Sequence, residues 1–195
     1  MNLDDHPKAA ELGWKLRSSR TGYENEILRL REDHFEVPGS GGKTYAYVER
    51  GPAVIIVPVT AKGEIILLRQ YRYPVDEYCL EVPAGTARDA GDLSLEEVAA
   101  KELKEEIGAT YSRMESVGSF FSNNALSDES CHVFVAFDVV LAQRPEPEAT
   151  EEIEAFPVPA GEAIARVRRG EMKTGPAALA MLLCEPKLRE RGFLE

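Results

Sequence analysis

The stretch Ala-Ala-Lys-Glu-Leu-Lys-Glu-Glu-Ile-Gly, residues 99–108, places three glutamates three and four positions apart in a run of helix-forming residues. At about 3.6 residues per turn, Glu102, Glu105 and Glu106 fall within one arc of roughly 100°, next to an apolar arc. Like charges at these spacings cost about 0.2 to 0.5 kcal/mol for each pair. Either water solvates this face or a divalent cation binds to it, since clustered carboxylates are hard oxygen ligands.

The whole sequence is typical of a globular protein with one substantial domain and a small extension. It has 195 residues, of which 44% are hydrophobic and 29% are charged. No stretch approaches the about 20 apolar residues that a membrane-spanning helix needs. The first residues, Met1 to His6, lack the basic and apolar regions of a secretory signal. We therefore expect a cytoplasmic protein that does not insert into membranes.

Charge and cysteine content narrow the possible partners. The net charge of −11 argues against nucleic acid as the main partner, because phosphate backbones bind clustered Lys and Arg. A small anion in a local basic pocket remains possible. Cys79, Cys131 and Cys184 are odd in number and widely separated, which favours reduced thiols over a disulfide framework or a metal site.

Residues 1–50 are expected to form an N-terminal extension. Residues 27–31 and 43–50 alternate between apolar and polar positions and flank the turn Pro-Gly-Ser-Gly-Gly at 38–42. This pattern predicts a β-hairpin. The first 20 or so residues are polar, and we expect them to lie across the surface or to fray.

Residues 51–195 are expected to form the main domain. Apolar runs predict buried strands, and two further helices are expected near the C-terminus. This order of elements favours a mixed sheet with helices packed against it. The predicted strands are 53–59, 64–72, 117–121 and 131–140, and the two helices are 160–169 and 175–184.

The acidic helix has clear start and stop signals. Ser94 is followed three residues later by Glu97, which is the spacing of a capping box. Gly108 follows Ile107 and is the expected C-terminal stop. The helix is therefore predicted to run from Ser94 to about Ile107.

The sequence from Gly85 to Ala109 resembles the Nudix hydrolase signature, which reads Gly, five residues, Glu, seven residues, then Arg-Glu-apolar-x-Glu-Glu-x-Gly-apolar. Residues 101–109 match the second half at every position but the first, where Lys101 replaces Arg. Lysine cannot hold a carboxylate bidentately as arginine does. The first half is two residues longer than the pattern, and Asp92 is the candidate for its acidic residue.

The resemblance implies the Nudix fold, an α+β fold with a mixed sheet sandwiched between helices, here with the N-terminal β-hairpin extension. Within the family the chain is similar to the ADP-ribose and ADP-sugar diphosphatases. Arg-Gln-Tyr-Arg at 69–72 and Glu-Val-Pro-Ala-Gly at 81–85 carry this similarity. It implies hydrolysis of the diphosphate bond of ADP-ribose or a related nucleoside diphosphate sugar, giving a nucleoside monophosphate and a sugar phosphate.

The resemblance also implies a function for the acidic helix, which is to bind a metal ion. Clustered carboxylates can hold a divalent metal while leaving coordination sites for water and phosphate oxygens. Glu102, Glu105 and Glu106 are therefore expected to bind Mg²⁺, or Mn²⁺, and the family suggests the carbonyl of Ala84 as a further ligand. Gly85, the first residue of the signature, is assigned to substrate binding.

Residues 120–129 stand where the relatives carry a loop with a catalytic glutamate. Glu129 is the predicted general base, because a loop acid can approach a metal-activated water from the side opposite the helix. Two alternatives stay open: Asp128 takes this role, or a helix glutamate such as Glu105 both binds metal and accepts the proton. The relatives usually have Ser-Pro-Gly where this loop reads Asn-Asn-Ala at 123–125.

The resemblance further implies how the substrate is held. Arg50 and Arg72 are candidates to clamp the diphosphate, and Tyr45 could stack on the base. Arg69 ranks lower, since it could point to the opposite face from Arg72. We expect a homodimer in which the segment 25–50 crosses to its partner, because a lone hairpin has little to pack on within one chain.

The partner is thus expected to be a small nucleoside diphosphate derivative, with neither nucleic acid nor membrane involved. A Nudix hydrolase of another nucleotide, such as a dinucleoside polyphosphate or an oxidised nucleoside triphosphate, is the first alternative. RNA cap removal is disfavoured by the acidic charge. A third possibility is a module that senses a nucleotide sugar without cleaving it. The intact glutamates argue against this third possibility, and the missing acid in the first half of the signature and Lys101 keep it open.

Overall fold

The computed structural model describes residues 6–88, 90–146 and 152–195. The chain divides into two compact units. Unit 1 contains residues 1–51 and 123–129, and unit 2 contains residues 52–122 and 130–195. The loop that carries Glu129 therefore belongs to unit 1, although the chain on both sides of this loop belongs to unit 2.

Unit 2 is built around a mixed sheet, to which seven of the described strands belong. Its main path runs β12, β5, β4, β10 and β9, while β6 pairs with β5 and β7 pairs with β4. β4 and β10 are parallel, and the other ladders are antiparallel. The strands are β4 (Ala53–Val59), β5 (Glu64–Arg72), β6 (Glu77–Glu81), β7 (Ala84–Thr86), β9 (Arg113–Phe121), β10 (Ser130–Phe137) and β12 (Ile153–Pro159).

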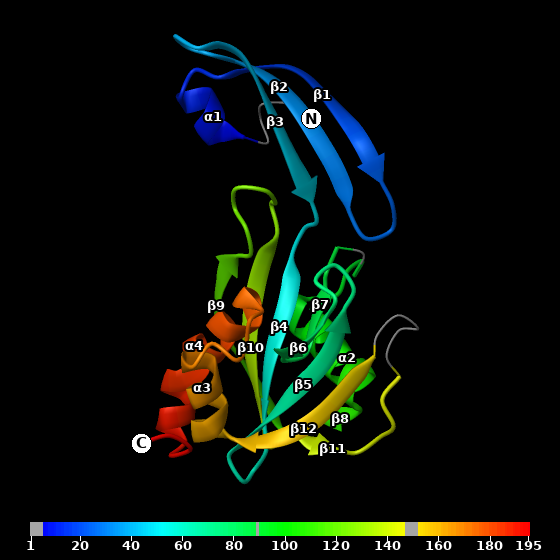
Figure 1. Ribbon diagram of the computed structural model, residues 1–195, viewed down its shortest axis with the longest axis vertical. Coiled ribbons are helices and arrows are strands. Elements are labelled where there is room, and N and C mark those ends of the chain that lie inside the picture. The colour runs from blue at the N-terminus through cyan, green and yellow to red at the C-terminus, as the bar shows by residue number, and fades with distance from the viewer. Residues whose placement is uncertain (1–5, 89, 147–151) are drawn as a thin grey trace. The chain divides into compact units, whose positions relative to one another are not determined.

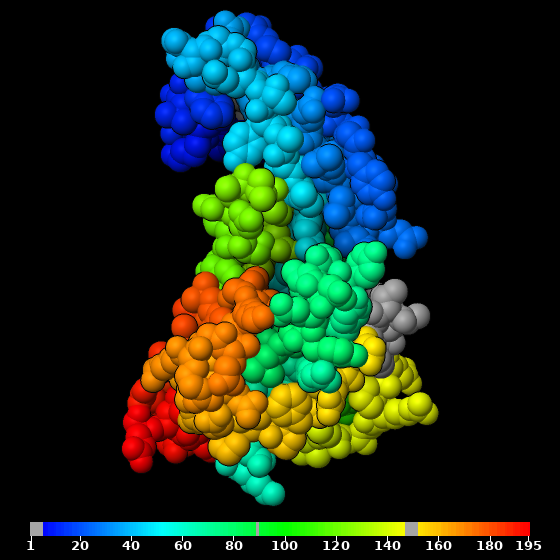
Figure 2. Space-filling view, viewed as in Figure 1, coloured from blue at the N-terminus to red at the C-terminus, as the bar shows by residue number. Residues whose placement is uncertain are grey.

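Helices cover both faces of this sheet (Figure 1). α3 (Ala160–Arg168) and α4 (Gly175–Glu190) pack on one face, and α2 (Leu95–Ile107) packs on the other. In the space-filling view α3 and α4, coloured orange to red, lie over the strands of unit 2 (Figure 2). The expected α+β architecture, a mixed sheet between helices, is confirmed.

Alternation along the central strands produces two apolar layers. Ile55 and Val57 belong to the layer under α3 and α4, and Val54 and Ile56 belong to the layer under α2. All four are 3% exposed or less. A strand buried on both faces reads as a continuous apolar run, which is why β4, β5 and β10 could be predicted from such runs.

Three strands of the sheet were not predicted. β6 and β7 are only five and three residues long, too short for a periodic pattern. β12 contains Pro157 and Pro159, and it lies at the edge of the sheet, where proline is tolerated. A separate small ladder joins β8 (Ala109–Thr110) to β11 (Val140–Leu141).

α2 begins and ends where the sequence predicts. The Glu97 N–H donates to Ser94 Oγ over 3.2 Å, and the Ser94 N–H donates to the Glu97 carboxylate over 2.8 Å. The two bonds form a capping box. Gly108 takes a φ of +61°, and a Cβ there would lie 2.1 Å from the Gln143 carbonyl oxygen. Only glycine fits at this end of the helix.

Unit 1 contains an antiparallel sheet and the short helix α1 (Pro7–Glu11). The predicted hairpin is confirmed, but the expectation that residues 1–20 fray or cross the surface is wrong for β1, which pairs along β2. Residues 1–5 lie outside the described residues. β1 has no apolar face, and hydrophobic patterning therefore could not reveal it. The strands are β1 (Lys15–Glu24), β2 (Arg29–Val37) and β3 (Gly41–Glu49).

The three cysteines are free thiols. Cys131 and Cys184 are buried, and burial raises the pKa of the Cys184 thiol to about 12. A thiol that stays protonated acts as a packing group rather than a nucleophile. Among the helices that the structure describes, none has the length and apolar character needed to cross a membrane.

Candidate active site

The three α2 glutamates differ in their surroundings. Glu106 is only 4% exposed, whereas Glu102 and Glu105 are half-buried. Glu105 forms an ion pair with Lys101, with 2.9 Å between Oε2 and Nζ. Burying a carboxylate costs free energy unless hydrogen-bond partners or a cation compensate its charge. α2 therefore presents one strongly desolvated acid and two acids that solvent still reaches.

Glu102 packs directly on the backbone of β7. A Cβ built on Gly85 would lie 2.1 Å from the Cδ of Glu102 and 2.3 Å from its Oε1. The Glu102 carboxyl group therefore fills the space that any other residue at position 85 would need. The structure thus brings two predicted site residues together, with Gly85 against a predicted metal ligand.

The ladder between β4 and β7 determines where the Ala84 carbonyl points. The Ile56 N–H donates to the Pro83 carbonyl over 2.8 Å, which makes these residues a hydrogen-bonded pair. Bonded and non-bonded pairs alternate along an antiparallel ladder, so the next pair, Ala84 opposite Ile55, is non-bonded. The Ala84 carbonyl therefore points away from β4 and takes no part in this ladder.

These groups have the chemistry of a site for a hard divalent cation. Three carboxylates and one backbone carbonyl are the oxygen donors that Mg²⁺ prefers, and the Glu102–Gly85 packing brings one carboxylate to the strand that carries the carbonyl. In the part of the chain that the structure describes, no three His, Cys, Asp or Glu side chains already converge as a metal cluster. Asp92 is exposed in the turn before α2. The donors therefore fit a metal but are not drawn together.

Arg72 is held from one side by Glu81. The guanidinium donates to both carboxylate oxygens, with 3.1 Å from Nε to Oε1 and 2.5 Å from Nη2 to Oε2. Thr174 Oγ1 also donates to Oε1 of Glu81 over 2.9 Å. Glu81 is buried, while 43% of the Arg72 side chain stays exposed. A fixed guanidinium with an exposed edge is suited to bind an anion.

Arg69 has a different environment from Arg72. Residues three apart on a strand point to opposite faces, and the Arg69 guanidinium stacks over the Tyr78 ring at 3.8 Å from its centroid. It also lies 3.7 Å from the Glu154 carboxylate. These contacts place Arg69 in a surface cluster of its own.

Residues 123–129 pack on β3 within unit 1. The Val48 N–H donates to the Leu126 carbonyl over 2.8 Å, and the Asp128 N–H donates to the Val48 carbonyl over 3.4 Å. The Asp128 carboxylate in turn accepts the backbone N–H of Arg50 over 2.8 Å. Asp128 therefore fixes the backbone just after β3.

Two predicted site residues, Arg50 and Glu129, meet in unit 1, and a third, Tyr45, contacts the loop that carries Glu129. Arg50 Nε lies 3.2 Å from Glu129 Oε1, and the Tyr45 hydroxyl donates to the Ala125 carbonyl over 3.0 Å. The Glu129 side chain is only 13% exposed. Glu129 is thus a shielded carboxylate with a cationic partner, and Tyr45 is tied to the same loop.

Sequence reasoning missed the positioning tasks of Glu81 and Asp128. Glu81 had a usable signal, because a charged residue beside the apolar run Val-Pro-Ala needs a partner if it is buried. The hydrogen bond from Arg50 to Asp128 had no signal in the sequence, since these residues are 78 positions apart.

Comparisons with known proteins give a consistent picture. The family model described as NUDIX domain matches residues 49–177. The ADP-ribose pyrophosphatase of Mycobacterium tuberculosis is 34% identical over 176 residues, covering 89% of this chain and 84% of that protein. The ADP-ribose pyrophosphatase of Bacillus subtilis is 28% identical over 160 residues, covering 82% and 85%. A crystal structure of an ADP compounds hydrolase shares the fold, with a TM-score of 0.72 at 20% identity over 92% of this chain and 96% of that one.

Proposed function

Because this chain belongs to the Nudix family and is a hydrolase related to ADP-ribose pyrophosphatases, we propose that it cleaves ADP-ribose or a related nucleoside diphosphate sugar. Water attacks one phosphorus of the diphosphate, and the bond from that phosphorus to the bridging oxygen breaks. The products are a nucleoside monophosphate and a sugar phosphate.

The observation that carries this proposal is the packing of Glu102 on Gly85, on the helix that also carries the buried Glu106. We assign Glu102, Glu105, Glu106 and the Ala84 carbonyl as ligands of Mg²⁺, or Mn²⁺. A bound divalent cation supplies charge neutralisation at the phosphate oxygens and lowers the pKa of its water. To bind the cation, Glu105 must give up its ion pair with Lys101. Because this ion pair is exposed, its loss costs little free energy.

Arg72 and Arg50 are proposed to bind the diphosphate. Glu81 orients the Arg72 guanidinium, and a guanidinium is a fork of donors that matches phosphate oxygens. Arg50 is proposed to bind the same group, and Tyr45 to stack on the base. Tyr45 has the least support, because its hydroxyl is already used by the loop.

Glu129 is proposed to accept the proton of the attacking water. Its ion pair with Arg50 also favours a second role, in which Glu129 positions Arg50 for the diphosphate. The two roles predict different kinetics. Loss of a base lowers kcat, whereas loss of a residue that positions a binding group raises KM.

A homodimer is part of the proposal. Among the residues that the structure describes, Phe35 is the one buried apolar side chain of unit 1, so its strands gain little from packing on themselves. Light scattering at micromolar protein tests this point, and a fully active monomer would contradict it. We also propose a cytoplasmic location, because the cysteines are free thiols.

A substrate panel with Mg²⁺ or Mn²⁺ tests the reaction. ADP-ribose, other nucleoside diphosphate sugars, a dinucleoside polyphosphate and an oxidised nucleoside triphosphate are compared, with products resolved by chromatography and phosphate measured after phosphatase treatment. ADP-ribose or a close analogue should have the highest kcat/KM. Preference for the dinucleoside polyphosphate or the triphosphate would reassign the substrate. Nucleotide-sugar binding without turnover of any compound would make the protein a sensor.

A further inference from the structure

Unit 1 contains a small cavity, and Tyr45 is the one residue of its described lining to which the proposed reaction assigns a role. It has a volume of about 240 Å³, and its lining includes Trp14, Phe35, Tyr45 and Tyr47 together with Asp33 and Asp128. Pockets for drug-sized ligands measure about 300 to 1,000 Å³. The occupant of this cavity is therefore a small molecule or a small group.

The aromatic rings of this cavity come in two pairs. Trp14 and Phe35 lie 5.6 Å apart between centroids, and Tyr45 and Tyr47 lie 6.3 Å apart. Both pairs have interplanar angles of 63°, which is an edge-to-face arrangement. The face of an aromatic ring carries partial negative charge, so a ring that turns its face to the cavity favours a cation there.

The acidic residues of the cavity also favour a bound cation. Asp33 is 1% exposed, accepts a hydrogen bond from Ser19 and lies 3.9 Å from Arg31. The lining contains Asp128 as a second carboxylate but neither Lys nor Arg, and His6 alone among the described lining residues can become cationic. Burial first, and then the charge of Asp33, raises the pKa of the Tyr47 hydroxyl, while the charge of Arg31 acts in the opposite direction.

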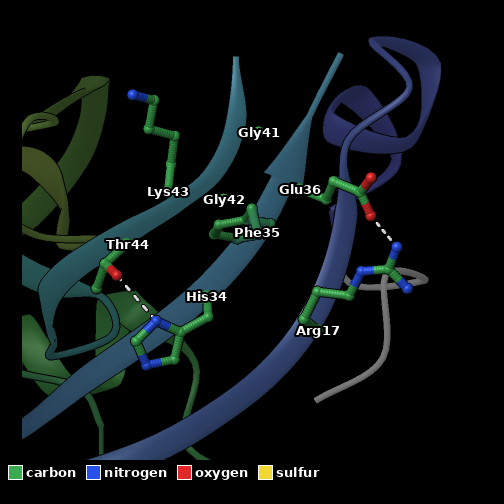
Figure 3. Close-up of a pocket in the computed structure, with 8 residues that line it drawn as sticks. All are labelled: Arg17, His34, Phe35, Glu36, Gly41, Gly42, Lys43 and Thr44. Atoms are coloured by element: carbon green, nitrogen blue, oxygen red, sulfur yellow. Dashed lines mark hydrogen bonds and ion pairs between the residues drawn. The ribbon is translucent and has the colours of Figure 1, made fainter. Parts of the chain in front are cut away.

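A second hollow on unit 1 shows the contrast (Figure 3). Four of its side chains form two pairs: Arg17 forms an ion pair with Glu36, and His34 Nδ1 lies 2.8 Å from Thr44 Oγ1. Lys43 adds a second cationic side chain to this lining. Phe35 is the one aromatic hydrocarbon ring in the described lining. Glu36 is the one carboxylate of that described lining and stands against Arg17 and Lys43, so that hollow lacks the acidic character of the aromatic cavity.

We propose that the cavity lined by Trp14, Phe35, Tyr45, Tyr47, Asp33 and Asp128 binds a small organic cation, such as a trimethylammonium group. Quaternary ammonium groups bind to aromatic cages through cation–π attraction, and nearby carboxylates add Coulomb attraction. A phosphate-bearing ligand is disfavoured, because the lining supplies two carboxylates and no Lys or Arg. The proposal does not depend on the proposed hydrolysis.

The fluorescence of Trp14 gives a direct test, because it is the one tryptophan of the chain. The full-length protein is titrated with choline chloride, with 3,3-dimethyl-1-butanol as its neutral isostere, and with sodium chloride at matched ionic strength. Choline should give a saturable change, and the isostere should bind about tenfold more weakly. Equal affinity for the isostere, or no saturable change with choline, would overturn the proposal.

Variants connect the signal to the cavity. Tyr47→Leu should weaken choline binding severalfold, and so should Asp33→Asn, which keeps the shape and the hydrogen bond to Ser19. Tyr23→Leu is the matched control, because Tyr23 is exposed on the same sheet and does not line the cavity. If Asp33→Asn does not fold, Tyr47→Leu and the isostere still decide the result. Unchanged affinity in Tyr47→Leu would overturn the assignment.

Competition with AMP in the absence of divalent cations separates this cavity from a nucleotide site. AMP at millimolar concentration should leave the choline affinity unchanged, since the lining repels phosphate. Displacement of choline by AMP would assign the cavity to the substrate base and overturn the proposal.

Discussion

Units 1 and 2 are stabilised by different interactions. Unit 2 buries two apolar layers, and many of their side chains, such as Val57 and Leu103, are fully buried. Unit 1 pairs three described strands through their backbones and adds cross-strand ion pairs such as Arg20–Glu32 and Arg29–Glu49. Exposed ion pairs contribute little, whereas apolar burial is the dominant favourable term in folding. Unit 2 is therefore stabilised mainly by apolar burial, and unit 1 mainly by its backbone ladders.

The residues of the candidate site are also divided between unit 2 and unit 1. The predicted metal ligands lie on α2 and β7 of unit 2, where Glu102 packs on Gly85 and Glu106 is buried. Arg50 and Glu129 lie on unit 1, where they pair with each other. Ligands on a packed scaffold keep their geometry when substrate is absent, whereas a surface ion pair can exchange partners. The five predictions below test this difference, from the largest expected effect to the smallest.

Glu106→Gln should reduce turnover nearly to background while the fold stays intact. The amide keeps the volume of the buried side chain and removes the charge that holds the cation. Initial rates at saturating Mg²⁺ and the thermal midpoint measure the two effects. Glu96→Gln is the control, because Glu96 is exposed in the first turn of the same helix. High activity of Glu106→Gln would contradict the metal site.

Glu129→Gln should lower kcat by about 10² to 10⁴, with little change in KM or in Mg²⁺ affinity. Asp128→Asn should cost much less, because the amide oxygen can still accept the Arg50 N–H. Single-turnover rates and Mg²⁺ titrations on both variants measure this. A raised KM with normal kcat would make Glu129 the residue that positions Arg50, and an unimpaired enzyme would place the base elsewhere.

Gly85→Ala should displace the Glu102 carboxylate, because the new Cβ would lie 2.1 Å from its Cδ. Misplacing a ligand should weaken Mg²⁺ affinity by about 10- to 100-fold. Gly161→Ala is the matched control, since a Cβ at Gly161 meets no atom within 4 Å. Mg²⁺ titrations of activity compare the two. Normal Mg²⁺ affinity in Gly85→Ala would show that the packing of Glu102 is unrelated to metal.

Lys101→Arg should be neutral or activating, because a guanidinium can hold Glu105 bidentately. Lys101→Ala should weaken Mg²⁺ affinity by less than tenfold, since an exposed ion pair is worth about 0.2 to 1 kcal/mol. Both are measured as the Mg²⁺ concentration for half-maximal activity. Identical values in wild type, Arg and Ala variants would make Lys101 an ordinary surface charge.

Arg20→Gln should leave the thermal midpoint unchanged at about 0.15 M salt, although it removes the ion pair with Glu32. Glu32 holds the pKa of Arg20 above its usual value, but this pair is solvated and screened. Differential scanning calorimetry at low and high salt tests this. A clear fall in the midpoint at both salt concentrations would show that ion pairs, rather than the backbone ladder, stabilise unit 1.

The sequence by itself determined the elements whose signals are local. The capping box of Ser94 and Glu97, the stop at Gly108 and the acidic arc of α2 all depend on residues within one or two helical turns. The core strands could be predicted because burial on both faces requires a continuous apolar run. β1 could not be predicted from the sequence, because it is stabilised by backbone pairing with β2 and has no apolar pattern.

Only the tertiary structure decided which distant groups meet. In the fold, Thr174 donates a hydrogen bond to Glu81, which is 93 positions away in the sequence and pairs with Arg72. The fold also packs Glu102 on Gly85. It also joined the loop 123–129 to β3. Such pairings depend on strand register and on the packing of helices against the sheet. A periodic pattern says which face of an element is buried, but it does not say which residue lies opposite.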